Sequence, residues 1–178
     1  MCLLYGWGRQ NTGRIEDFRM SNIDIRDAAA KYLAYRSHTC MEMRKHLLQK
    51  GYEEEAVTEV VAEFADYGYL DDSRYCMQYF EYAFGKGKGK RLVFAELREK
   101  GVDSDIIQFA FEDWQAEHET EYDEKSRAHE EAAKVLRMAE LDESEKPDEK
   151  LLAKVGRRLQ SKGYSSDVIY SVIGALRR

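Results

Sequence analysis

The sequence has little proline, little cysteine and no long hydrophobic run. Its single proline is Pro147, and its three cysteines, Cys2, Cys40 and Cys76, are scattered along 178 residues. An odd and scattered set of cysteines is typical of reduced thiols, so we expect neither a disulfide framework nor a cysteine metal site. The apolar stretches are too interrupted to span a membrane, and the apolar start lacks the basic segment of a signal peptide. We therefore expect a cytoplasmic protein without membrane contact.

The sequence also lacks a recognisable catalytic or metal-binding motif. His38, His46, His118 and His129 have neither the spacing of a zinc-protease helix nor a cysteine at ligand spacing, so we interpret them as helix-surface residues. The segment Gly85–Arg91 alternates glycine with lysine, but it lacks the spacing and the Ser or Thr of a phosphate-binding loop. We interpret this segment as a flexible linker that can also contact an acidic partner. No enzyme activity, metal or cofactor is predicted.

Charge is abundant but unevenly distributed. Charged residues make up 35% of the chain and hydrophobic residues 43%, which is typical of helices with solvated faces. The formal net charge of −6 argues against a dedicated duplex-DNA-binding protein, because such proteins are usually basic. Residues 112–149 are mostly acidic, whereas residues 86–98 and 150–178 are mostly basic. The basic runs are either solvated faces or contacts to an acidic partner, and the sequence leaves both interpretations open.

A short phrase that occurs three times reveals internal repeats. Each copy has a leucine, then a lysine, then Gly51, Gly101 or Gly163, followed directly by tyrosine or valine. Apolar residues recur at helical spacing before and after each glycine. A glycine in the left-handed conformation can end a helix, and the acidic or serine residues that follow can start the next one. The spacing of the copies is that of tandem modules.

Each repeat has a further amphipathic segment upstream of its glycine. These segments cover residues 27–36, 72–84 and about 122–139, so each repeat is predicted to hold three helices. The predicted fold class is all-α, with three tandem three-helix repeats in an elongated or curved array. The expected boundaries are an N-terminal extension that can be flexible, followed by three repeats: residues 1–24, 25–70, 71–118 and 119–178.

The segment Gly68–Tyr75, which reads Gly-Tyr-Leu-Asp-Asp-Ser-Arg-Tyr, resembles the regulatory protein RecX family. Tyr32–Tyr52 and Glu96–Ile107 are similar to the same family, and the resemblance extends from Asp27 to the C-terminus. The resemblance implies an all-α protein of tandem three-helix repeats. It also implies a non-catalytic protein that binds the RecA recombinase filament on single-stranded DNA and modulates it, usually by inhibition, in recombination, DNA repair and the SOS response.

The alternative is a protein that binds DNA directly, because three-helix modules with a turn are similar to helix-turn-helix units. We expect a monomer whose direct contact with DNA, if any, is weak. The predicted partner-binding residues are basic groups of the second and third repeats, which could face either acidic protein surface or phosphate on the filament. They are Lys86, Lys88, Lys90, Arg91, Arg98, Arg157, Arg158, Lys162, Arg177 and Arg178.

Overall fold

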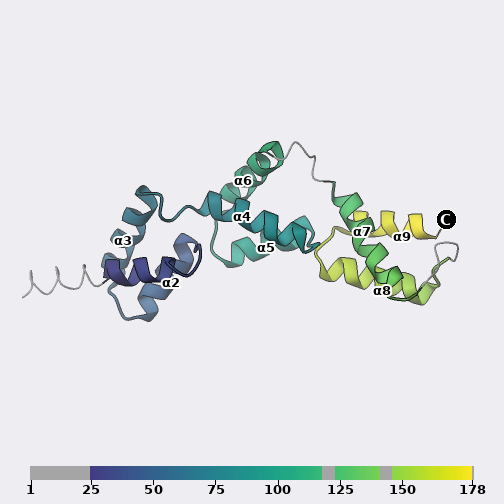
Figure 1. Cartoon of the computed structure of the whole chain (residues 1–178), viewed down its shortest axis with the longest axis horizontal. Helices are drawn as coiled ribbons and strands as arrows, with labels where there is room; N and C mark the ends of the chain where they lie inside the picture. Colours follow the sequence, from purple (N-terminus) through teal and green to yellow (C-terminus); the bar gives the residue numbers. More distant parts are fainter. Residues whose placement is uncertain (1–24, 118–122, 141–145, 178) are drawn as a thin grey trace, which may run out of the picture. The chain divides into compact units, whose positions relative to one another are not determined.

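The computed structural model describes residues 25–117, 123–140 and 146–177, so the predicted N-terminal extension lies outside the described residues. Within these ranges every regular element is an α-helix and no strand occurs (Figure 1). No helix in the described ranges is both long enough and apolar enough to cross a membrane. The chain divides into two compact units between Leu70 and Asp71, and each unit is described by itself below.

The first unit is a single three-helix module. A helix over residues 25–33 precedes α2 (Cys40–Gln49) and α3 (Glu54–Asp66). Helix α2 begins with a capping box, in which the Thr39 hydroxyl accepts from the backbone N–H of Glu42 at 3.0 Å. The apolar residues at helical spacing on these helices meet in one core. Its buried members are Ile25, Ala29, Met43, Leu47, Ala56, Val57, Val60 and Leu70.

Two histidines of this module stack on the ring of Tyr32. The ring centroids lie 3.6 Å apart for His38 and 3.8 Å apart for His46. Burial lowers the pKa of His38, with a contribution from the charge of Arg36, and burial also lowers the pKa of His46. His38 is buried, so its interpretation as a surface residue was wrong. The stacking partner, Tyr32, lies on the upstream helix. In the sequence, the histidines were compared only with possible metal ligands, so this contact was not predicted.

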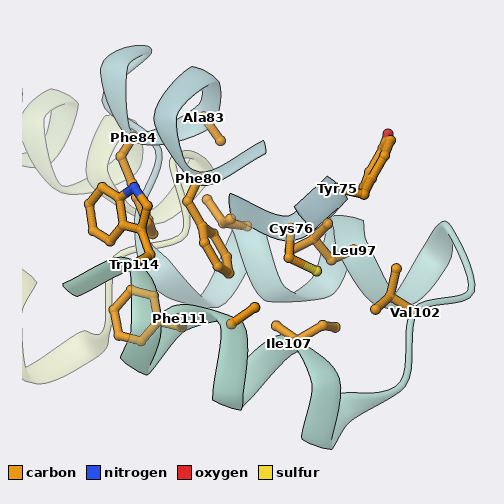
Figure 2. Close-up of a cluster of buried hydrophobic side chains, with 12 residues drawn as sticks. Tyr75, Cys76, Phe80, Ala83, Phe84, Leu97, Val102, Ile107, Phe111 and Trp114 are labelled. Atoms are coloured by element: carbon orange, nitrogen blue, oxygen red, sulfur yellow. The ribbon is translucent and has the colours of Figure 1, made fainter. Parts of the chain in front are cut away.

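The second module begins the second unit and consists of α4 (Asp72–Gly85), α5 (Lys90–Glu99) and α6 (Ser104–Glu117). The Asp71 side chain caps α4 by accepting from the backbone N–H of Arg74 at 2.9 Å. Helices α4 and α6 pack against each other through aromatic rings, as Figure 2 shows. The buried core consists of Tyr75, Cys76, Phe80, Ala83, Phe84, Val93, Leu97, Val102, Ile107, Ala110, Phe111 and Trp114.

The third module has the same plan, with α7 (Glu124–Arg137), α8 (Glu149–Ser161) and α9 (Ser166–Leu176). Asp148 and Ser165 cap α8 and α9 through side-chain oxygens that accept from backbone N–H groups. The apolar stripes of the three helices again converge. The buried core consists of Ala128, Ala132, Val135, Val155, Leu159, Tyr164, Val168 and Val172.

The repeated glycines end α2, α5 and α8 as the sequence predicted. Their φ angles are +89° for Gly51, +83° for Gly101 and +84° for Gly163, all in the left-handed region. In each copy the backbone N–H of the residue after the glycine donates to the carbonyl of the repeated leucine, which closes the last turn of the helix. The glycine phrase is therefore a helix stop signal.

Candidate functional site

The glycine–lysine segment that follows α4 is fixed against the third module. The backbone N–H of Gly89 donates to the carbonyl of Lys162 at 2.7 Å, and the Lys162 ammonium donates to the carbonyl of Lys86 at 2.6 Å. The Tyr164 hydroxyl donates to the carbonyl of Gly87 at 3.2 Å. The interpretation of this segment as a flexible linker was therefore wrong, because its backbone is hydrogen-bonded to residues that follow it by a whole module. We call this contact the module junction.

Glycine is required at the junction because two backbone segments approach closely there. A Cβ atom on Gly89 would lie 2.7 Å from the carbonyl carbon of Gly163, which is far inside van der Waals contact. A Cβ atom on Gly163 would overlap the backbone of Leu92 on α5. The alternation of glycine and lysine thus serves close packing between modules as well as charge.

A buried carboxylate lies close to three cations beside the junction. Glu131 of α7 is 3% exposed and pairs with the ammonium of Lys134. Its Oε2 lies 3.8 Å from a guanidinium nitrogen of Arg158 and 3.9 Å from the ammonium of Lys162. Burial lowers the pKa of Lys162, and the charge of Glu131 opposes that shift. Two predicted partner-binding residues, Arg158 and Lys162, therefore already have a structural role.

Beside the junction, a groove of about 870 Å³ runs between α5 and the α8–α9 pair. Its α5 wall includes Arg91, Ala95 and Arg98, which share one helix face because they are spaced by four and three positions. Both arginines are exposed, and no hydrogen bond or salt bridge joins either guanidinium to another described residue. The α5 wall of the groove therefore has two exposed guanidinium groups that a partner can contact.

Lys90 also lines the groove, but its ammonium faces the aromatic core of its own module. The nitrogen lies 4.1 Å from the ring centroid of Phe111 and 4.9 Å from that of Phe94. Burial lowers the pKa of Lys90, although the charges of Glu124 and Glu112 oppose the shift. Lys90 is thus largely a packing residue, unlike Arg91 and Arg98.

The opposite wall of the groove was not predicted from the sequence. Gly156 and Gln160 of α8 and Ile169 and Tyr170 of α9 line it. Tyr170 is 74% exposed, although Val168 and Val172 on the same helix are buried. Tyr170 was not among the residues predicted from the sequence, and nothing local in the sequence indicates that its face of α9 borders α5.

Glu124, the first residue of α7, lies at one end of the groove. Burial raises the pKa of its carboxyl group, while hydrogen bonds from the backbone at Ser165 and Lys90 oppose that shift. These two backbone sites mark the starts of α9 and α5, and a carboxylate at a helix N-terminus is favourably placed. Glu124 thus lies near the starts of α5 and α9, while its buried Oε1 has no hydrogen-bond partner among the described residues.

The other predicted partner-binding residues lie outside the groove. The Lys88 ammonium lies 2.5 Å from Oε1 of Glu96, and the Arg177 guanidinium lies 2.9 Å from Oε2 of Glu149. Lys86 is exposed, and Arg178 lies outside the described residues. The structure therefore brings together Lys90, Arg91 and Arg98 among the predicted set, and it places the others elsewhere.

Arg157 belongs to a second basic surface, on the outer side of α8. It borders a shallow hollow of about 560 Å³ together with Lys146, Lys150 and Lys154. Lys150, Lys154 and Arg157 share one helix face, and among the described residues Asp148 is the one carboxylate that lines the hollow. We call Lys146, Lys150, Lys154 and Arg157 the α8 basic surface.

The fold and these surfaces define an all-α protein of tandem three-helix modules with basic surfaces on its second and third modules. Models of the first, second and third three-helix domains of RecX match residues 26–64, 71–110 and 122–173. The chain belongs to the RecX family, whose members are non-catalytic regulatory proteins. The predicted family, the all-α class and the three-helix repeats are thus confirmed, whereas the elongated or curved arrangement stays a prediction.

Individual relatives agree with this assignment. Regulatory protein RecX of Mycobacterium sp. (strain KMS) is 33% identical over 147 residues, which cover 80% of this chain and 76% of the relative. Regulatory protein RecX of Vibrio campbellii is 34% identical over 148 residues, which cover 83% of this chain and 88% of the relative. The crystal structure of RecX from Lactobacillus salivarius has the same fold, with a TM-score of 0.71 at 21% identity over 89% of this chain and 97% of that one.

Proposed function

We propose that this protein binds the RecA recombinase filament on single-stranded DNA and inhibits its ATPase and strand-exchange activities. Membership of the RecX family supports a regulatory role, and the groove between α5 and the α8–α9 pair supports binding through the second and third modules. The observation that carries the proposal is the pair of available guanidinium groups, Arg91 and Arg98, on one wall of that groove.

The mechanism follows from binding alone. The described residues include no cluster of His, Cys, Asp and Glu that could hold a metal ion. A chain of small modules can make several weak contacts along a helical filament, and linked contacts reinforce one another through their effective concentration. A protein held between recombinase subunits in this way opposes the subunit movements that accompany ATP hydrolysis, because those movements would break its contacts.

The test is the rate of ATP hydrolysis by RecA on single-stranded DNA while this protein is titrated in. We expect the rate to fall as the concentration rises. The double variant Arg91→Glu with Arg98→Glu should need at least about tenfold more protein for the same effect, since a tenfold change corresponds to about 1.4 kcal/mol of binding energy. Lys31→Glu with Lys45→Glu, two exposed lysines of the first module, is the charge-matched control and should inhibit like the parent. An unchanged rate at saturating parent protein, with no binding to the filament, contradicts the proposal.

The α8 basic surface favours a second candidate, direct binding to DNA. Cations at successive turns of one helix face are suited to contact successive phosphates, and the described residues that line the hollow include one carboxylate, Asp148. A salt series with bare single-stranded and duplex DNA distinguishes the candidates. Direct binding predicts an affinity that falls steeply with salt and is reduced by Lys150→Glu with Lys154→Glu. Equal weak binding by parent and variant at all salt concentrations excludes this surface as a DNA site.

A further inference from the structure

The groove between α5 and the α8–α9 pair combines two separated guanidinium groups with an apolar wall. We propose that it receives an acidic amphipathic segment of the recombinase protein, and that it does not receive DNA. This inference rests on the proposed function and names the part of the filament that the groove recognises.

Arg91 and Arg98 are seven positions apart on α5, which places their Cα atoms about 10 Å apart along the helix axis. An extended segment advances about 3.3 Å per residue and its side chains alternate between two faces, so carboxylates two or four residues apart share a face at about 7 or 13 Å, on either side of this separation. The planar guanidinium group holds a carboxylate through two parallel hydrogen bonds, which gives such a pair directional specificity. The two arginines therefore match a short acidic segment.

The middle of the groove provides room and apolar surface for the rest of that segment. Ala95 stands between the two arginines on α5, and Gly156 on α8 lines the groove on the other wall. The small Ala95 side chain leaves space for an incoming side chain on the α5 wall, whereas a Cβ on Gly156 would already lie 3.2 Å from the side chain of Ile173. Ile169 and the exposed Tyr170 then offer apolar contact, and arginine and tyrosine are residues that protein interfaces favour at their centres.

The charges around the groove fit a protein segment better than a nucleic acid. Among the described residues that line the groove, Arg91 and Arg98 are the cations held by neither a ring nor a salt bridge, because the Lys90 ammonium lies over the rings of Phe94 and Phe111. The charge of Arg91 also acts on Glu124. The carboxyl group of Glu124 lies at one end. A nucleic acid strand gains affinity from many phosphate contacts, whereas the net charge of this chain is −6. A segment with two or three carboxylates can use both arginines without bringing a long polyanion against that charge.

The module junction holds the groove in a preorganised shape. Its two walls belong to different modules, and the hydrogen bonds from Gly89 to Lys162 and from Lys162 to Lys86 fix them relative to each other. The Tyr164 hydroxyl adds a third connection by donating to the carbonyl of Gly87. A partner segment therefore binds without first ordering the groove, and preorganisation of this kind favours affinity.

Site-specific photo-crosslinking tests the inference. The full chain carries p-benzoylphenylalanine in place of Tyr170, or in place of the groove residue Gln160 in a second variant. A third variant carries it at Phe109, which is 65% exposed on α6 and does not line the groove. Each variant is mixed with RecA filaments on single-stranded DNA, its cosedimentation with the filament is measured, and the crosslinked species is identified by mass spectrometry.

We expect the Tyr170 or Gln160 variant to crosslink to a recombinase segment that contains at least two acidic residues near an apolar one. Adding Arg91→Glu with Arg98→Glu should reduce that yield at least tenfold, while the Phe109 variant should give another product or none. Crosslinks to DNA, to this chain or a second copy of it, or to a non-acidic segment overturn the inference. So does the absence of crosslinks from both groove positions when the parent cosediments, and the proposed function then still stands. Failure of the parent to cosediment rejects both.

Discussion

The backbone N–H of Gly89 donates to the carbonyl of Lys162 at 2.7 Å, so the start of α5 is bonded to the end of α8. Lys162 belongs to the third copy of the repeated phrase, and Gly89 belongs to the segment before the second copy. The repeats are therefore alike in sequence but not equivalent in the structure. In the third copy the same phrase both ends a helix and forms part of the module junction.

Gly163→Ala should destabilise the protein more than Gly51→Ala does. Both glycines have φ near +85°, so both variants lose about 1 kcal/mol because alanine disfavours that conformation. A Cβ on Gly51 has nothing within 4 Å, whereas one on Gly163 overlaps Leu92, which should add about 1 to 3 kcal/mol. Equilibrium unfolding in urea, followed by circular dichroism, measures both changes. Equal losses of unfolding free energy for the two variants would show that Leu92 moves aside at little cost.

Leu97→Ala should cost about 2 to 5 kcal/mol of unfolding free energy, because removal of a fully buried leucine leaves a cavity in the core of the second module. Leu97 is 0% exposed, whereas Leu48 of the first module is 38% exposed and serves as the control. Leu48→Ala should cost less than about 1.5 kcal/mol. The urea midpoints and slopes of the two variants and the parent give the loss of unfolding free energy for each substitution. A Leu97→Ala midpoint at the parent value would show that Leu97 is not a core residue.

The first module should lose stability as the pH falls below about 6.5, the ordinary pKa of histidine. The folded state lowers the pKa of His38 and His46, so the unfolded state binds protons more readily. Their contribution is present above pH 6.5 and is lost as the pH falls through the lowered pKa values.

Urea unfolding of parent and variants between pH 7.5 and pH 5 measures this dependence. We expect His38→Gln to have a smaller change with pH than the parent, and His129→Gln, at an exposed site on α7, to behave like the parent. If His38→Gln keeps the full dependence on pH, the stacked histidines are not its source.

The arrangement of the modules can be tested by small-angle X-ray scattering. Each module has its own buried core, and a chain of such modules is predicted to be elongated or curved. A single compact globule of this length would have a radius of gyration of about 16 Å. We expect a clearly larger value at all concentrations of a dilution series. A value at the compact estimate would contradict the elongated array.

Features that depend on neighbouring residues were predictable from the sequence. Gly51, Gly101 and Gly163 end helices, and Asp71 starts one, because these residues satisfy backbone groups one to five positions away. The three-helix plan followed from apolar spacing, which depends on the helical period alone. Family resemblance then added the regulatory function, which neither composition nor spacing provides.

The junction and half of the groove could not be predicted in the same way. The contact between Gly89 and Lys162 joins two backbone groups, so no pair of side chains in the sequence indicates it. Charge alone selected Arg91 and Arg98, which line the groove, and equally Arg158 and Arg177, which have carboxylate partners on other helices. Tyr170 was missed because a helix pattern shows that a residue faces outward, but not which element lies beyond it.

The module junction also has a consequence for synthesis on the ribosome. The carbonyl groups of Lys86 and Gly87, just past α4, receive their hydrogen bonds from Lys162 and Tyr164. Those donors are translated only after the whole second module and most of the third have been made. While the chain is growing, the glycine–lysine segment must therefore stay hydrated, and it reaches its final partners only when the last two helices emerge. A nascent chain that stops before α8 therefore lacks both the partners of this segment and the second wall of the groove.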